Sequence, residues 1–129
     1  MADGIVSNLV LEKAESFAVR IVRLYKHLQS KGEMVMSKQV LRSGTSIGAN
    51  VTEGHYAASR ADFINKYAIA QKEAAETLYW LRLLTKTGYL GDDEATRAII
   101  VDCDEIIRLL VSSIKTTKKN MERSDLRHS

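Results

Sequence analysis

Hydrophobic residues recur every three or four positions along four segments of this chain, which is the spacing of one helical face. The pattern predicts helices over about residues 9–30, 34–56, 60–86 and 92–117. The third segment is the most regular, because its seam keeps spacings of three and four over three heptads. The seam positions are Phe63, Tyr67, Ala70, Ala74, Thr77, Leu81 and Leu84. Since the connections are short, neighbouring helices should run antiparallel, and we predict an all-α, up-down-up-down antiparallel four-helix bundle.

Local signals mark several of the helix ends. Gly32 and Gly88 follow the first and third apolar patterns and are typical helix stops. Ser59, with Asp62 three residues later, is a typical N-cap arrangement for the third helix. The chain has no proline, which suits long uninterrupted helices and argues against a turn-rich fold.

The first and fourth segments carry more apolar surface than one bundle core requires. In the first segment the apolar side chains cover an arc of about 160°, compared with the ~100° needed to face a single core. The fourth segment has two apolar lines. These are a seam of Ile99, Cys103, Ile106, Leu110 and Ile114 and a flanking line of Ile100, Ile107 and Val111. This excess predicts a second buried contact.

Small residues lie on the core-facing side of the second segment. Gly44 and Gly48 each lower helix propensity by about 1 kcal/mol relative to alanine. We therefore expect a neighbouring helix to approach closely enough to compensate for this loss.

A strip of polar side chains lies beside that small-residue face. Its members, spaced by three and four residues, are Gln39, Arg42, Ser46, Asn50 and Glu53. One interpretation is a seam of hydrogen bonds and ion pairs at a helix or subunit boundary, with Glu73 or Glu76 pairing with Arg42. The other interpretation is a direct ligand site.

Composition limits the range of functions. A chain of 129 residues with 45% hydrophobic and 27% charged residues is typical of a single soluble domain. No apolar run approaches the ~20 residues of a membrane-spanning helix, and we expect no export signal and a cytoplasmic, bacterial protein. Cys103 is the only cysteine, so an intramolecular disulfide and a thiolate-rich zinc site are excluded.

We expect no catalytic residue, no metal site and no cofactor. Di-iron four-helix bundles need two Glu-x-x-His pairs, and none occurs in this chain. Glu53 and His55 are two residues apart and diverge around a helix. Cys103 lies on the apolar seam, where a cysteine is usually an inert small hydrophobe.

The net charge of +3 is unevenly distributed along the chain. Residues 12–42 carry a net charge of +4 and residues 92–114 a net charge of −4, so the first and fourth helices are electrostatically complementary. Residues 1–114 hold 14 basic and 14 acidic side chains, which leaves the whole excess on residues 115–129. Apolar spacing stops after Ile114, and this segment is expected to fray into a basic tail.

These charges predict contacts with nucleic-acid phosphates. The expected contact residues are Lys13, Arg20, Arg23, His27 and Lys31 on one face of the first helix, and Lys115, Lys118 and Lys119 in the tail. The alternative interpretation is a solvated charged face. Aromatic side chains could also offer stacking surfaces to bases, although core or interface packing is the expected role of most of them. They are Tyr56, Tyr67, Tyr79, Trp80 and Tyr89.

The segment Gln39 to Gly54 resembles a known family. Its Arg42-Ser43, Ser46-Ile47, Asn50 and Glu53-Gly54 are similar to the signature of the four-helix-bundle proteins named for 23S rRNA intervening sequences. Asp62-Phe63, Glu76, Tyr79, Leu81 and Gly88-Tyr89-Leu90 are similar to the third helix and following turn of that family, and the resemblance covers about residues 10–118. Two departures are Lys72-Glu73, where many members carry Gly-Ser, and Gly44, where alanine is commoner.

The resemblance implies a homopentamer of up-down bundles. It also implies a relationship to the accessory variability determinant of diversity-generating retroelements, a basic pentamer that binds nucleic acid and a reverse transcriptase. The family name reflects genes found inside rRNA inserts and does not imply a ribosomal role. We therefore expect a non-enzymatic homo-oligomer that binds RNA or DNA without strong sequence preference, with no membrane contact. A protein-interaction scaffold without a nucleic-acid role is the alternative.

Overall fold

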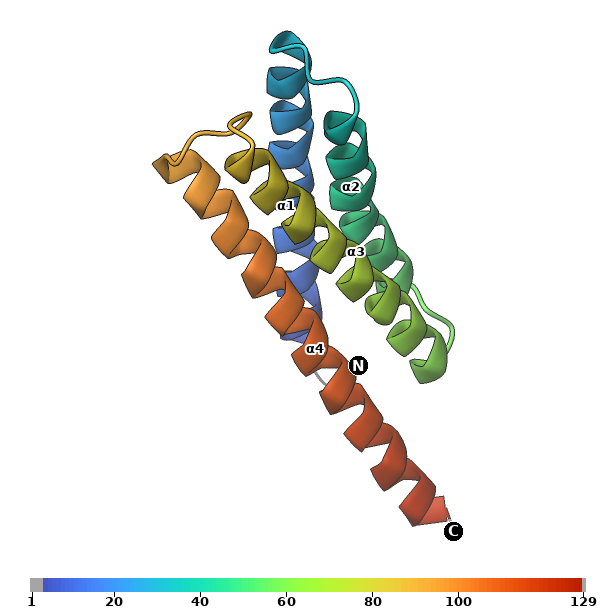
Figure 1. The fold of residues 1–129 in the computed structure, drawn as a ribbon. Coiled ribbons are helices and arrows are strands. Elements are labelled where there is room, and N and C mark those ends of the chain that lie inside the picture. The colour runs from blue at the N-terminus through green and yellow to red at the C-terminus, as the bar shows by residue number, and fades with distance from the viewer. Residues whose placement is uncertain (1–3, 129) are drawn as a thin grey trace.

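The computed structural model describes residues 4–128 and folds into four α-helices (Figure 1). α1 spans Gly4–Ser30, α2 spans Met36–His55, α3 spans Arg60–Lys86 and α4 spans Glu94–His128. Successive helices run in opposite directions, and the described residues contain no strand. The predicted all-α, up-down-up-down bundle is confirmed.

The helix ends predicted from glycine and serine signals are present. Gly32 and Gly88 adopt φ values of +83° and +85° just after α1 and α3, in the left-handed region that favours glycine. The Oγ atom of Ser59 accepts a hydrogen bond of 3.1 Å from the backbone N–H of Asp62. This bond satisfies one of the otherwise unpaired amides at the start of α3.

The start of α2 differs from the prediction at residue 34, because a carboxylate outside the helix caps it. Glu33 accepts hydrogen bonds from the backbone N–H groups of Val35 (3.0 Å), Met36 (2.8 Å) and Ser37 (2.8 Å). Val35 occupies the N-cap position and makes no side-chain cap bond. The chain between α1 and α2 is therefore closed by Glu33, and the helix begins at Met36.

The buried core contains the predicted seams of α3 and α4 in full. All seven positions from Phe63 to Leu84 and all five from Ile99 to Ile114 are buried. The expected close approach to α2 is made by α1. A Cβ atom added to Gly44 would lie 2.8 Å from Cγ2 of Ile21, and one added to Gly48 would lie 3.5 Å from the carbonyl oxygen of Ala14.

The expectation of a fraying tail was wrong, because α4 continues as a helix to His128. No glycine or proline follows Gly91, so the sequence contains no residue that stops the helix. Thr117 is only 3% exposed and Met121 is partly buried, so the inward stripe continues in residues that are less apolar. In Figure 1 the end of α4 projects beyond the other three helices.

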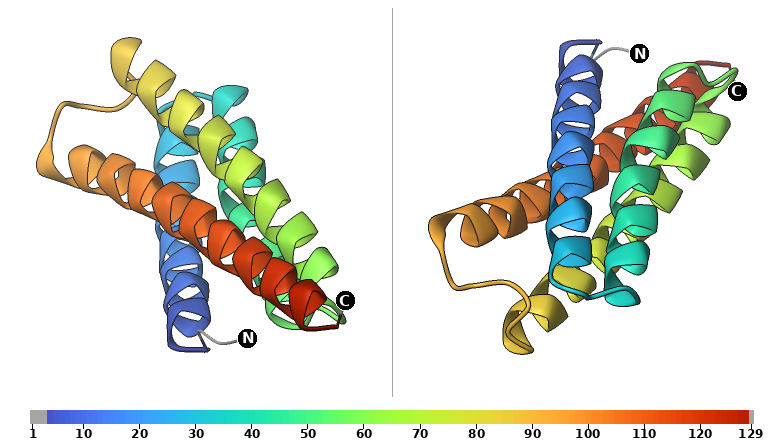
Figure 2. Two further views of the ribbon diagram at one scale, coloured as in Figure 1. Left: turned by 90° about the horizontal axis from the view of Figure 1, so that it is seen from below. Right: turned by 90° about the horizontal axis from the view of Figure 1, so that it is seen from above.

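The helices are not equally aligned. Figures 1 and 2 show α4 crossing α1 at a marked angle, whereas α2 and α3 lie side by side along their length. The α1–α4 side is therefore the more open side of the bundle. It contains the two clefts described next.

Candidate functional site

The polar strip of α2 faces α3 and forms ion pairs with it. The guanidinium of Arg42 pairs with Glu73 at 3.3 Å and also with Glu76. The indole N–H of Trp80 donates a 2.9 Å hydrogen bond to the same Glu76 carboxylate. The predicted pairing of Arg42 with Glu73 or Glu76 is therefore observed with both residues.

The other members of the strip also bond within the bundle. Gln39 accepts a 3.4 Å hydrogen bond from Nε of Arg42, and the side-chain amide of Asn50 donates to the carbonyl oxygen of Ser46 at 2.9 Å. Glu53 pairs with Lys66 of α3 at 3.3 Å. The bonds of Gln39 and Asn50 stay within α2, whereas the ion pairs of Arg42 and Glu53 reach α3 and favour the interpretation of the strip as a structural seam between the two helices.

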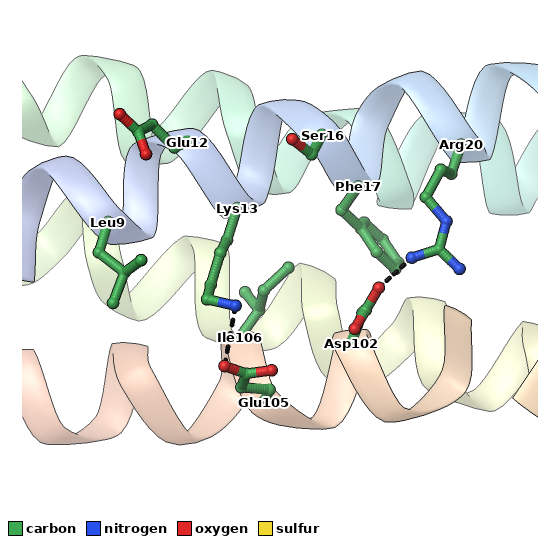
Figure 3. A pocket seen from close by; sticks show the side chains of 9 residues that line it. All are labelled: Leu9, Glu12, Lys13, Ser16, Phe17, Arg20, Asp102, Glu105 and Ile106. Atoms are coloured by element: carbon green, nitrogen blue, oxygen red, sulfur yellow. Dashed lines mark hydrogen bonds and ion pairs between the residues drawn. The ribbon is translucent and has the colours of Figure 1, made fainter. Parts of the chain in front are cut away.

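The basic face of α1 is divided by its contacts with α4. Lys13 pairs with Glu105 at 2.9 Å, and Arg20 pairs with Asp102 (Figure 3). The predicted complementarity of the first and fourth helices is therefore present inside one bundle. Lys13 and Arg20 are already neutralised by carboxylates, which reduces their attraction for phosphate.

Two clefts lie along the α1–α4 side, and Arg20 lines both. One has a volume of about 280 Å³ and includes Lys13, Phe17, Asp102 and Glu105 in its lining (Figure 3). The other has a volume of about 370 Å³ and lies between the second half of α1 and the start of α4. Its lining combines Leu24, Leu90 and Ile99 with Arg23, His27 and Asp93.

The predicted residues near the end of α1 are exposed. Arg23 and His27 border the larger cleft, and Lys31 lies in the connection to α2. Among the described residues, no ion pair involves any of these three side chains. They remain candidate contacts for an anion.

The basic residues in the C-terminal part of α4, from Lys115 onward, form a separate region, which we call the α4 arm. Its five cationic side chains are exposed, and none of them takes part in an ion pair with another described residue. They are Lys115, Lys118, Lys119, Arg123 and Arg127. The end of this arm lies at the opposite end of the molecule from the connection between α1 and α2 (Figure 1). The predicted cationic residues therefore do not form one continuous surface.

Glu33, Asp93 and Cys103 have shifted pKa values, and each shift has a structural explanation. Burial would raise the pKa of Glu33, but its backbone hydrogen bonds hold it below the ordinary value. Hydrogen bonds from Thr96, including one of 2.8 Å from its backbone N–H, lower the pKa of Asp93. Burial raises the pKa of Cys103 to about 12, and its Sγ donates to the carbonyl oxygen of Ala74. Cys103 is therefore a protonated core residue with little nucleophilic character.

Over residues 4–128 the structure contains no group of three or more histidine, cysteine, aspartate or glutamate side chains placed to hold a metal ion. None of the helices in this part of the chain is long and apolar enough to cross a membrane.

Sequence reasoning did not identify one contact at the base of the arm. Nη1 of Arg60, the first residue of α3, donates a 3.4 Å hydrogen bond to the carbonyl oxygen of Asn120. In the sequence, Arg60 is one of several cations spread around the third helix. Its proximity to the arm depends on how α3 and α4 pack, which no local pattern reveals.

Comparisons with known proteins identify relatives of this fold. The family model described as 23S rRNA-intervening sequence protein matches residues 7–112. A crystal structure described as a protein with unknown function from the S23 ribosomal protein family of Bacteroides thetaiotaomicron is 57% identical, with a TM-score of 0.82. The match covers 85% of this chain and 98% of that chain. The comparison with curated proteins gives no match.

Proposed function

This chain belongs to the 23S rRNA-intervening sequence protein family, and we propose that it is a non-enzymatic, homo-oligomeric bundle that binds RNA or DNA through phosphate contacts. Binding through phosphates carries little sequence information, so the protein would accept many sequences.

The α4 arm is the observation that carries this proposal. It holds five exposed cations and two acidic residues, and its cations have no carboxylate partner within the described chain. Because they are exposed and form no ion pair with a described residue, these charges are accessible to a polyanion, and the end of α4 projects beyond the other three helices (Figure 1). Release of counterions from the nucleic acid would supply most of the binding free energy.

The contact set is narrower than the one predicted from the sequence. Lys115, Lys118 and Lys119 become the principal contacts, while Lys13 and Arg20 serve mainly to join α1 to α4. The exposed end of α1 would provide secondary contacts through a different part of the assembly.

Self-assembly is supported by apolar side chains that the single chain leaves exposed. Val101 of α4 is 62% exposed, and Val19 and Val22 of α1 are also exposed. Burial against further copies would stabilise an oligomer, for which the family resemblance implies a pentamer. Several arms in one particle would then bind one nucleic acid multivalently, which strengthens individually weak contacts.

Fluorescence anisotropy with a labelled RNA tests the proposal. The double variant Lys118→Glu, Lys119→Glu should bind at least tenfold more weakly than the wild type at low salt, because charge reversal replaces attraction with repulsion. The matched control is Lys72→Glu, Lys86→Glu on α3, which makes the same charge change at exposed positions and should bind nearly normally. Absence of binding by the wild type at low salt would refute the proposal.

A protein-interaction scaffold is the second candidate function. The specific observation in its favour is the 370 Å³ cleft, whose apolar floor and Arg23 and His27 border suit an acidic, partly apolar segment of another protein. In that case the Lys118→Glu, Lys119→Glu variant would retain its partner.

A further inference from the structure

We infer that the end of the bundle where the α2–α3 turn meets α4 is a binding site for single-stranded nucleic acid, in which Tyr56 stacks on an unpaired base. Arg60 and the α4 arm would hold the adjacent phosphates. This inference rests on the proposed function and specifies its ligand class.

Tyr56 is placed to contact a ligand and not the core. It is the C-cap residue of α2, and it is 80% exposed. By contrast, Tyr67 is fully buried in the core. An aromatic side chain that remains so exposed gains little from the fold itself, and its ring offers a face for stacking.

The neighbouring histidine supports the ring from one side. The His55 ring lies edge-on to the Tyr56 ring, with centroids 5.1 Å apart and planes at 86°. This arrangement restricts the tyrosine ring and still leaves it largely open to solvent. A restricted ring loses less conformational entropy when a base stacks on it.

The hydrogen bond between Arg60 and Asn120 brings this turn against the arm. Tyr56 and Arg60 are the two ends of the short connection between α2 and α3, and Arg60 contacts the α4 backbone at 3.4 Å. Figure 1 shows the turn and the projecting end of α4 at the same end of the molecule. Arg60 therefore contacts the arm although the two segments lie 60 residues apart in the sequence, and Tyr56, with its exposed ring, precedes Arg60 by four residues.

This combination favours single strands over duplexes. Phosphates attract the arm in either form, but the base faces of a duplex are hidden by stacking on their neighbours. An unpaired base can turn out and stack on an aromatic side chain, as in other single-strand binding surfaces. Tyr56 would therefore add affinity only for unpaired nucleotides.

The test compares the binding of tyrosine variants to two labelled RNA probes. One is an oligouridylate of about 12 nucleotides, and the other is a duplex of similar length. Single-strand sites typically cover ~4–16 nucleotides, and the length of the oligouridylate lies within this range. Tyr56→Ala should weaken oligouridylate binding roughly fivefold or more and leave duplex binding unchanged. Tyr56→Phe should bind like the wild type, because it keeps the ring. Tyr79→Ala, at another exposed tyrosine on α3, is the matched control and should also bind like the wild type.

The outcomes separate this inference from the proposed function. If Tyr56→Ala binds oligouridylate as tightly as the wild type, or weakens duplex binding equally, the single-strand site is wrong. The proposed function stands in that case, provided that the wild type still binds RNA and the arm variant does not. If the wild type binds neither probe at low salt, both fail.

Discussion

Glu33 is a carboxylate that is only 6% exposed and is held by three backbone N–H groups at the start of α2. Burial penalises its charged form, but the hydrogen bonds and the positive end of the helix dipole favour it, and the pKa of Glu33 is lowered. At the residue scale, the charged side chains near the core mainly cap helices or join them through ion pairs. The same is true of Asp93, which caps α4, and of Arg42, which joins α2 to α3.

Replacing Glu33 by glutamine should destabilise the protein by about 1 kcal/mol at pH 7, the usual cost of a lost helix cap. Because the pKa of Glu33 is lower in the folded than in the unfolded chain, its contribution is complete above the unfolded value near 4.5 and is lost as pH falls through the folded value. The difference between Glu33→Gln and the wild type should therefore shrink below pH 4.5. Urea denaturation at pH 7 and at acidic pH measures both effects, and equal stability at pH 7 would contradict the assigned role.

At the scale of the helix, α2 depends on close approaches to its neighbours. A Cβ atom at Gly54 would lie 2.8 Å from Cδ1 of the Tyr67 ring, which is fully buried in the core. At Gly48 the nearest atom is the carbonyl oxygen of Ala14 at 3.5 Å, an ordinary contact distance. The two glycines thus look alike in the sequence but have different surroundings.

Alanine substitutions at these two positions should have opposite effects. Gly48→Ala should stabilise the protein by about 0.5–1 kcal/mol through higher helix propensity. Gly54→Ala should destabilise it by about 1–3 kcal/mol, since overpacking exceeds the same propensity gain. Thermal or urea unfolding of the pair checks this, and a destabilised Gly48→Ala together with an unchanged Gly54→Ala would contradict the packing described.

The helices could be predicted wherever both apolar spacing and end signals exist in the sequence. The bounds of α3 were predicted correctly because Ser59 and Gly88 mark them. The length of α4 was not predicted correctly, because the inward-facing positions near its end are occupied by residues such as Thr117 and Met121, which do not continue a strongly apolar pattern.

The same limit applies to the candidate site. The partners of Arg42 could be predicted because α2 and α3 are successive antiparallel helices with matching polar faces. The sequence could not show which cations of α1 form ion pairs with α4 and which stay free of them, because this depends on where α4 crosses α1. The proximity of Arg60 to the arm has the same cause.

At the scale of the whole molecule, the exposed apolar side chains of α1 and α4 favour assembly. Light scattering should give a mass that is a multiple of 14.4 kDa, with a pentamer as the stoichiometry that the family resemblance implies. Val101→Glu places a charge on the exposed apolar surface of α4 and should shift the protein toward smaller species without unfolding it. Lys72→Gln at an exposed position of α3 changes the net charge by the same single unit and is the control. A monomeric wild type would contradict this prediction.

The central claim is that the α4 arm binds nucleic acid through phosphate contacts, and the salt dependence of RNA affinity tests it most directly. A plot of the logarithm of the binding constant against the logarithm of salt concentration should be linear, with a slope of roughly −0.7 to −0.9 per phosphate contact. The Lys118→Glu, Lys119→Glu variant should lose about two contacts and show a correspondingly shallower slope, whereas Lys72→Glu, Lys86→Glu should keep the wild-type slope. Equal slopes for the wild type and the arm variant, or affinity that does not depend on salt, would contradict the account.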